Sequence, residues 1–138
     1  MTKPFNDSDP YGELTDTEKA ELRRADPKTV RLGRYPFRAS IKYYCAFQEG
    51  NLGPKTLEVD RRKLVQFSGV FEDLKMNKRI VSTDPRQFIQ AHISEFMIWM
   101  KKKNLNLSTQ EKYLQMLDRL LQLFGNDVVR VMRRDPLV

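Results

Sequence analysis

Apolar side chains in this sequence recur every three or four residues, and no segment alternates between apolar and polar residues with a period of two. The first spacing places side chains on one face of an α-helix, whereas the second would place them on one face of a strand. The sequence therefore predicts an all-α fold, a small bundle of four to five helices.

Signals for helix starts and stops set the boundaries of these helices. Pro36 and Pro54 suit a first helical turn, and Gly50 and Gly125 suit a helix end. Asp84-Pro85 has the pattern of an N-cap followed by a first-turn proline, and Ser108 or its neighbour caps the next helix. The predicted helices cover 16–25, 36–49, 54–74, 85–103, 107–124 and 126–134. The helix from 85 has the broadest apolar face, which favours the centre of the bundle: Phe88, Ile89, Ile93, Phe96, Met97, Trp99 and Met100.

Residues 1–35 differ from the rest of the chain because they are polar and hold few large apolar groups. We expect an N-terminal extension that is partly disordered, with a short helix near 16–25 where Thr15 and Glu18 have capping-box spacing. Residues 36–138 form the helical domain.

Charge is distributed unevenly along the chain. The net charge is +7, and residues 1–27 carry −3, so residues 28–138 carry +10. A polyanion is therefore a plausible partner. Residues 28–42 hold five basic and no acidic side chains, which fits a phosphate-binding segment or a flexible basic loop equally well.

The composition excludes several classes of protein. One cysteine and one histidine leave no disulfide framework, no cysteine-rich zinc site and few catalytic schemes. We expect Cys45 and His92 to be structural, and we expect no metal, no cofactor, no small-molecule substrate and no catalytic site. No apolar run approaches the roughly 18 residues of a membrane span, and no signal peptide opens the chain, so we expect a cytoplasmic protein without membrane contact.

Two of the predicted helices share a pattern at a distance of 53 residues. Five residues recur identically after this shift: Leu52, Thr56, Glu58, Leu64 and Phe71 meet Leu105, Thr109, Glu111, Leu117 and Phe124. Opposite the apolar stripe, the two helices carry matching faces: Lys55, Val59, Arg62 and Gln66 in one, Ser108, Lys112, Gln115 and Arg119 in the other. Arg, Lys and Gln side chains reach base edges and phosphates when a helix enters a major groove. These faces are either a DNA-binding surface or the polar outer surface of any exposed helix.

Residues 40–138 resemble the N-terminal core-binding domain of tyrosine recombinases, the phage integrase family. The resemblance rests on segments that each open or close a helix: Leu52-Gly53-Pro54-Lys55-Thr56, Val81-Ser82-Thr83-Asp84-Pro85, Leu107-Ser108-Thr109 and Asn126 to Pro136. It implies a SAM-like helical core that ends in an interdomain linker, and a catalytic domain that would complete a clamp around DNA. It also implies that helices 54–74 and 107–124 face adjacent major grooves, and that the outer helices, 36–49 and 126–134, contact other recombinase protomers in a synaptic complex.

The resemblance and the helix faces together predict the DNA contacts. Side chains near the major groove are Lys55, Thr56, Arg62, Gln66, Ser108, Thr109, Lys112, Gln115 and Arg119, and those near phosphates are Lys101, Lys102 and Lys103. We expect double-stranded DNA as the partner and a nucleoid-associated location. Replacing Arg62 and Arg119 by alanine should then weaken duplex binding without unfolding the domain.

The sequence departs from the family at two points. The family often has an aromatic residue where this chain has Asp60, which either perturbs packing or pairs with Arg61 or Lys63. The family's chemistry also needs a nucleophilic tyrosine, two arginines, a lysine and a His-x-x-Arg segment, whereas His92 is followed by Ile93-Ser94-Glu95. We therefore expect a fragment that lacks the catalytic domain and does not cleave DNA.

A different hypothesis is a protein-interaction module without DNA binding. It would dock other subunits through helices 36–49 and 126–134, and the aromatic run from Tyr43 to Phe47 favours it. A module of this kind should oligomerise in the absence of DNA.

Overall fold

The computed structural model describes residues 14–134, which form six α-helices and one short 3-10 helix. The first three α-helices are α1 (Asp16–Arg24), α2 (Pro36–Gln48) and α3 (Pro54–Met76). The 3-10 helix η1 (Pro85–Gln87) follows, and then α4 (Gln90–Lys102), α5 (Leu107–Leu123) and α6 (Val128–Arg134). No strand forms among the described residues, which contain a single isolated bridge between Glu49 and Leu52. The prediction of an all-α fold is confirmed, although residues 14–134 form six α-helices rather than four to five.

The helices begin where local chemistry favours a start. Pro36 and Pro54 occupy the first turns of α2 and α3, where the missing N–H costs no hydrogen bond. Thr15 and Glu18 form the predicted capping box at α1. α5 begins at Leu107, as predicted, but its cap is Asn106 rather than Ser108, because the Asn106 side chain accepts the Thr109 N–H at 2.8 Å.

The predicted helix from residue 85 is interrupted. Asp84 does accept the Arg86 N–H, but only the 3-10 turn η1 follows, and α4 begins at Gln90. Phe88 and Ile89 have extended backbones between the two. The cause is tertiary packing. The Phe88 ring stacks on Phe37 and contacts Phe71, and these contacts keep the backbone extended at this point. Ile89 then points outward and is 57% exposed, so its predicted place in the core is wrong.

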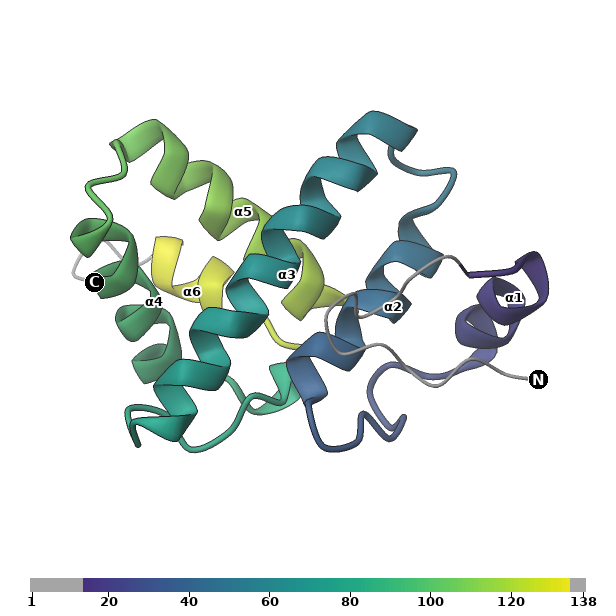
Figure 1. Ribbon diagram of the computed structural model, residues 1–138, viewed down its shortest axis with the longest axis horizontal. Helices are drawn as coiled ribbons and strands as arrows, with labels where there is room; N and C mark the ends of the chain where they lie inside the picture. Colours follow the sequence, from purple (N-terminus) through teal and green to yellow (C-terminus); the bar gives the residue numbers. More distant parts are fainter. Residues whose placement is uncertain (1–13, 135–138) are drawn as a thin grey trace.

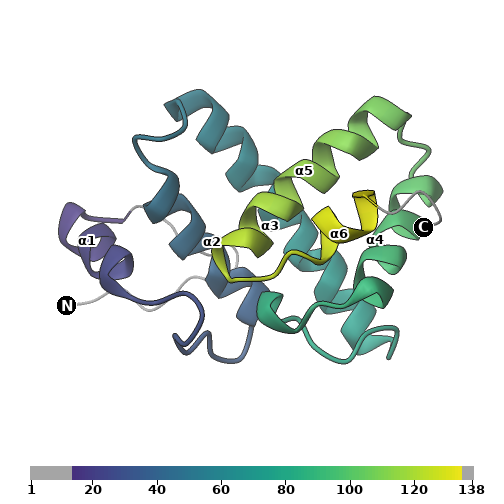
Figure 2. The same ribbon diagram turned by 180° about the vertical axis from the view of Figure 1, so that it is seen from behind.

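The core lies where α2, α3, α4 and α5 meet. In Figure 1, α3 and α5 cross near the centre, and their N-terminal ends diverge toward the top of the view. α1 packs against α2 at one side, and α4 and α6 lie together at the other, as the reverse view in Figure 2 also shows. The inner rings contact one another with centroid separations of 4.8–5.8 Å: Phe37, Phe67, Phe71, Phe88 and Phe96.

The internal repeat coincides with equivalent core positions. Leu64 and Leu117 are both fully buried, and Phe71 and Phe124 are buried as well. The matched glutamates are used differently, because Glu58 pairs with arginines of its own helix and Glu111 pairs with Arg133.

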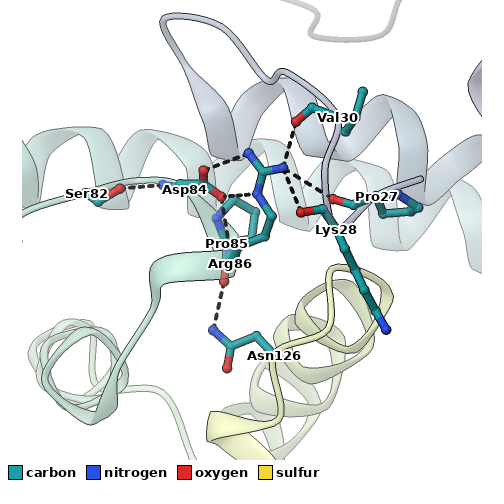
Figure 3. Close-up of polar contacts among 8 residues, drawn as sticks. All are labelled: Pro27, Lys28, Val30, Ser82, Asp84, Pro85, Arg86 and Asn126. Carbon is teal, nitrogen blue, oxygen red and sulfur yellow. Dashed lines mark hydrogen bonds and ion pairs between the residues drawn. The ribbon is translucent and has the colours of Figure 1, made fainter. Parts of the chain in front are cut away.

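Polar contacts fasten the segment before α2 to the rest of the bundle (Figure 3). The Arg86 guanidinium is held by Asp84 and donates to the backbone oxygen of Val30 at 2.6 Å, with longer contacts to those of Pro27 and Lys28. Leu32 is buried in the same core as the helices that follow. Residues 14–35, assigned by the sequence to an extension, thus pack against the helical domain.

The loop between α5 and α6 meets the same region. The Asn126 side-chain amide donates to the backbone oxygens of Pro85 and Phe88 at 2.8 and 2.9 Å, while its oxygen accepts the Val128 N–H that begins α6. Gly125 has a φ of +79°, and a Cβ there would lie 3.2 Å from the Lys28 side chain. Three separate loops therefore meet at this end of the molecule.

Candidate nucleic-acid interface

A groove of about 340 Å³ lies between the first half of α3 and the middle of α5. The lining residues are Lys55, Thr56, Val59, Asp60, Lys112, Gln115, Met116 and Arg119. Five of the twelve predicted contact residues are among them, and they come from both helices of the repeat. The structure thus places part of each predicted face around one shared hollow.

The other predicted residues lie outside this lining. Arg62, Gln66 and Ser108 are exposed, and Arg62 contacts Glu58 at 3.1 Å. Thr109 is half-buried beside the N-terminus of α5, where Asn106 binds its backbone N–H. The three consecutive lysines at the end of α4, Lys101, Lys102 and Lys103, are exposed and form a separate basic edge.

Arg119 is bound on one side to a buried acid. Its Nη2 donates to Asp60 Oδ2 at 2.9 Å, and its Nε donates to the Tyr44 hydroxyl at 3.2 Å. The same hydroxyl donates to Asp60 Oδ2 at 2.8 Å. Burial raises the pKa of Tyr44 well above its ordinary value, so the phenol keeps its proton. Three helices, α2, α3 and α5, therefore contribute to one closed polar cluster.

The partner expected for Asp60 is wrong. Arg61 pairs with Glu58, and Lys63 lies over the Tyr113 ring, 5.2 Å from its centroid. Asp60 is only 2% exposed, since it stands on the core-facing side of α3 in phase with Leu64. An acidic residue in phase with the apolar stripe of a helix indicates a buried charge that needs a cationic partner. This spacing does not identify Arg119 as that cation.

Arg119 therefore has a second role beyond the predicted one. Without it, the Asp60 carboxylate would stay buried with a phenol as its partner, which is costly. Replacing Arg119 together with Arg62 is therefore expected to lower stability as well as DNA binding, because Arg119 both lines the groove and neutralises an acid in the core.

Cys45 and His92 are buried, as a structural role requires. Burial raises the pKa of the Cys45 thiol to about 12. His92 Nδ1 accepts the Ile89 N–H, so Nε2 carries the proton and donates to the Ser82 backbone oxygen at 3.2 Å. Its ring stacks on Phe88, and burial lowers its pKa.

The predicted outer helix 36–49 is not an outer helix. α2 packs against α1, α3 and α5, and its aromatic run is mainly core, with Tyr44, Cys45 and Ala46 buried. Tyr43 is half-buried, its ring edge-on to Phe124. The run that favoured a protein-docking surface is thus explained by packing.

The basic segment 28–42 is partly engaged within the fold. Arg38 pairs with Glu72 and lies over the Tyr35 ring, 4.4 Å from its centroid, and Arg34 lies over the same ring at 5.5 Å. Lys28, Arg31 and Arg34 are exposed.

A larger hollow of about 810 Å³ lies between α1, the end of α2 and the start of α3. Its lining is largely apolar and includes three charged residues: Lys19 and Glu49 pair with each other at 2.9 Å, and Glu58 pairs with arginines of α3. None of the twelve predicted contact residues lines it.

Residues 14–134 hold no group of three His, Cys, Asp or Glu side chains that could bind a metal ion. None of the helices in this part of the chain is both long and apolar enough to span a membrane. Neither a family model, nor a curated protein sequence, nor a solved structure matches this chain.

Proposed function

We propose that this chain is a DNA-binding helical domain that contacts duplex DNA with α3 and α5. The observation that carries the proposal is the convergence of the two helix faces: Lys55 and Thr56 from α3 line the same groove as Lys112, Gln115 and Arg119 from α5. Cationic and amide side chains gathered in one hollow suit a polyanionic ligand.

The electrostatics of the groove support the proposal. Three of its side chains are cationic, and the one acid, Asp60, is buried and already bonded to Arg119 and Tyr44. α3 has no acidic residue in its first turn, and no described side chain caps its N-terminus. The positive end of the α3 dipole therefore adds to the potential near Lys55.

The resemblance to tyrosine recombinases extends this proposal. On this hypothesis the chain is the SAM-like core-binding domain of an integrase and does not cleave DNA, because the catalytic residues belong to a further domain. Other recombinase protomers would then be its protein partners, and the nucleoid its location. The order and spacing of the helix-opening segments support this finer assignment.

A salt series with duplex DNA tests the proposal. We expect the logarithm of the association constant to fall linearly with the logarithm of salt concentration, as for any protein that displaces counterions. The double variant Lys55→Ala/Lys112→Ala should reduce the slope by about 0.9 for each phosphate that it no longer neutralises.

The matched control removes two charges elsewhere. Arg24 and Lys75 are exposed and lie outside the groove, so Arg24→Ala/Lys75→Ala should leave most of the affinity intact. No binding by the unmodified chain at low salt, or equal decreases in affinity in the two double variants, would contradict the proposal.

A further inference from the structure

The Arg119 guanidinium is fixed along one edge and open along the other. Of its five N–H donors, one on Nε and one on Nη2 bond to Tyr44 and Asp60. The other three have no hydrogen-bond partner among residues 14–134. The side chain is 39% exposed and lines the groove, so these donors are available to a ligand there.

Asp60 and Tyr44 restrict how far Arg119 can move. Both are buried, on α3 and α2 respectively, and their own bond of 2.8 Å closes the triangle with the guanidinium. A free arginine loses much rotamer entropy when it binds a ligand, whereas one already held by two bonds loses less. The same bonds keep Arg119 from extending outward to a base edge.

We propose that the α3–α5 groove seats one phosphodiester group of duplex DNA, and that Asp60 and Tyr44 position Arg119 to bind it. Lys55 and Lys112 complete the site from the two helices. This inference rests on the proposed DNA binding and makes it more specific. A phosphate contact of this kind fixes the register of the protein on DNA and adds affinity that does not depend on sequence.

Two effects of Asp60 have opposite signs, which makes the inference testable. As a negative charge beside an anion site, Asp60 opposes DNA binding, so Asp60→Asn should tighten binding if charge is its only contribution. As a positioning residue it supports binding, so the same variant should weaken it. Tyr44→Phe changes no charge and removes only the hydroxyl that holds Arg119.

The experiment measures duplex affinity across a salt series for Asp60→Asn, Tyr44→Phe and the control Tyr43→Phe, together with thermal unfolding by circular dichroism. We expect the first two to weaken binding roughly threefold to tenfold, the effect of about one hydrogen bond, to a similar extent on different DNA sequences. Tyr43→Phe should bind as the unmodified chain does. In the unmodified chain, the Nε–H proton of Arg119 should exchange slowly with water. In both variants its ¹⁵N NMR signal should broaden or move to the chemical shift of free arginine.

The outcomes separate this inference from the proposed function. If the unmodified chain does not bind DNA, both the proposed function and this inference are wrong. If it binds and Lys55→Ala/Lys112→Ala weakens it, but Asp60→Asn and Tyr44→Phe leave affinity unchanged or raise it, only the positioning inference falls. A decrease confined to one DNA sequence would also overturn it, since it would indicate a base contact. Tyr44→Phe carries the test alone if Asp60→Asn does not fold.

Discussion

Asp60 lies on the buried face of α3, one helical turn from Leu64, where an apolar residue would be expected. Its helix neighbours gave no guide to its partner, because the cation is 59 residues away on α5. A spacing rule predicts contacts within a helix at three and four residues, a distance at which Lys63 lies from Asp60, whereas Arg61 is its neighbour in the sequence. The pairing with Arg119 follows from how α3 and α5 cross, which no local pattern contains.

The Asp60–Arg119 pair makes a prediction about stability. Arg119→Ala should lower the free energy of unfolding by about 3 kcal/mol, the lower end of the cost of leaving a buried acid without its cation. Chemical denaturation followed by circular dichroism measures this. Lys112→Ala, which removes an exposed cation from the same groove and helix, should change it by less than about 0.5 kcal/mol. Equal stability of the two variants would mean that Asp60 does not depend on Arg119.

His92 makes a prediction about pH. Its pKa in the folded protein lies below the ordinary value of 6.5, first because the ring is buried. A protonated ring would also turn an Nδ1–H toward the Ile89 N–H that it now accepts. The unfolded chain therefore binds more protons in this range, so the stability that His92 contributes is complete above its unfolded pKa and is lost as pH falls through the window below it.

Denaturation at pH values from 7 to 5.5 measures this effect. We expect the free energy of unfolding to fall with pH in the unmodified protein and to change less in His92→Gln. The same pH dependence in both proteins would assign it to other groups.

At the scale of elements, the long helices were predictable and the break before α4 was not. α3 and α5 carry sustained apolar stripes with clear start signals, and their predicted bounds agree with the structure to within two residues. Pro85 gave the same start signal, yet Phe88 leaves the helical path to reach Phe37 and Phe71. Aromatic packing between distant segments determines the backbone conformation there, and it cannot be predicted from the sequence around Pro85 alone.

The element that the sequence treated as an extension depends on Arg86. Arg86→Ala removes the donors to the backbone oxygens of Pro27, Lys28 and Val30, so residues 26–32 should detach while the central helices stay folded. Hydrogen exchange should show lower protection of the Val30 amide, which bonds to Asp26, and unchanged protection in the middle of α5. The global cost should be about 1.5–3 kcal/mol, as for hydrogen bonds to a charged group.

Arg130→Ala is the matched control, because it also removes an arginine from an ion pair, with Asp118, but lies on α6. It should leave Val30 protected. Unchanged exchange at Val30 in Arg86→Ala would show that burial of Leu32 alone holds the segment.

At the scale of the whole molecule, the sequence predicted an all-α bundle and two helix faces, and the structure adds how those faces meet. Lys55 and Lys112 were predicted as parts of separate faces, each directed at its own major groove. The structure adds that the crossing of α3 and α5 brings both side chains to one hollow of the protein. The crossing depends on side chains from four helices packing together, which is why periodicity along single helices could not give it.

The distance along the chain between Asp60 and Arg119 has a consequence for synthesis. A nascent chain that has left the ribosome only as far as α4 already contains the helix that carries the acid, but neither the guanidinium nor one wall of the groove. Burying Asp60 at that stage costs free energy, so the final packing of α2 against α3 is disfavoured until α5 is present. The last long helix to emerge thus completes both the packing and the groove, and incomplete chains that end before α5 lack the proposed DNA site.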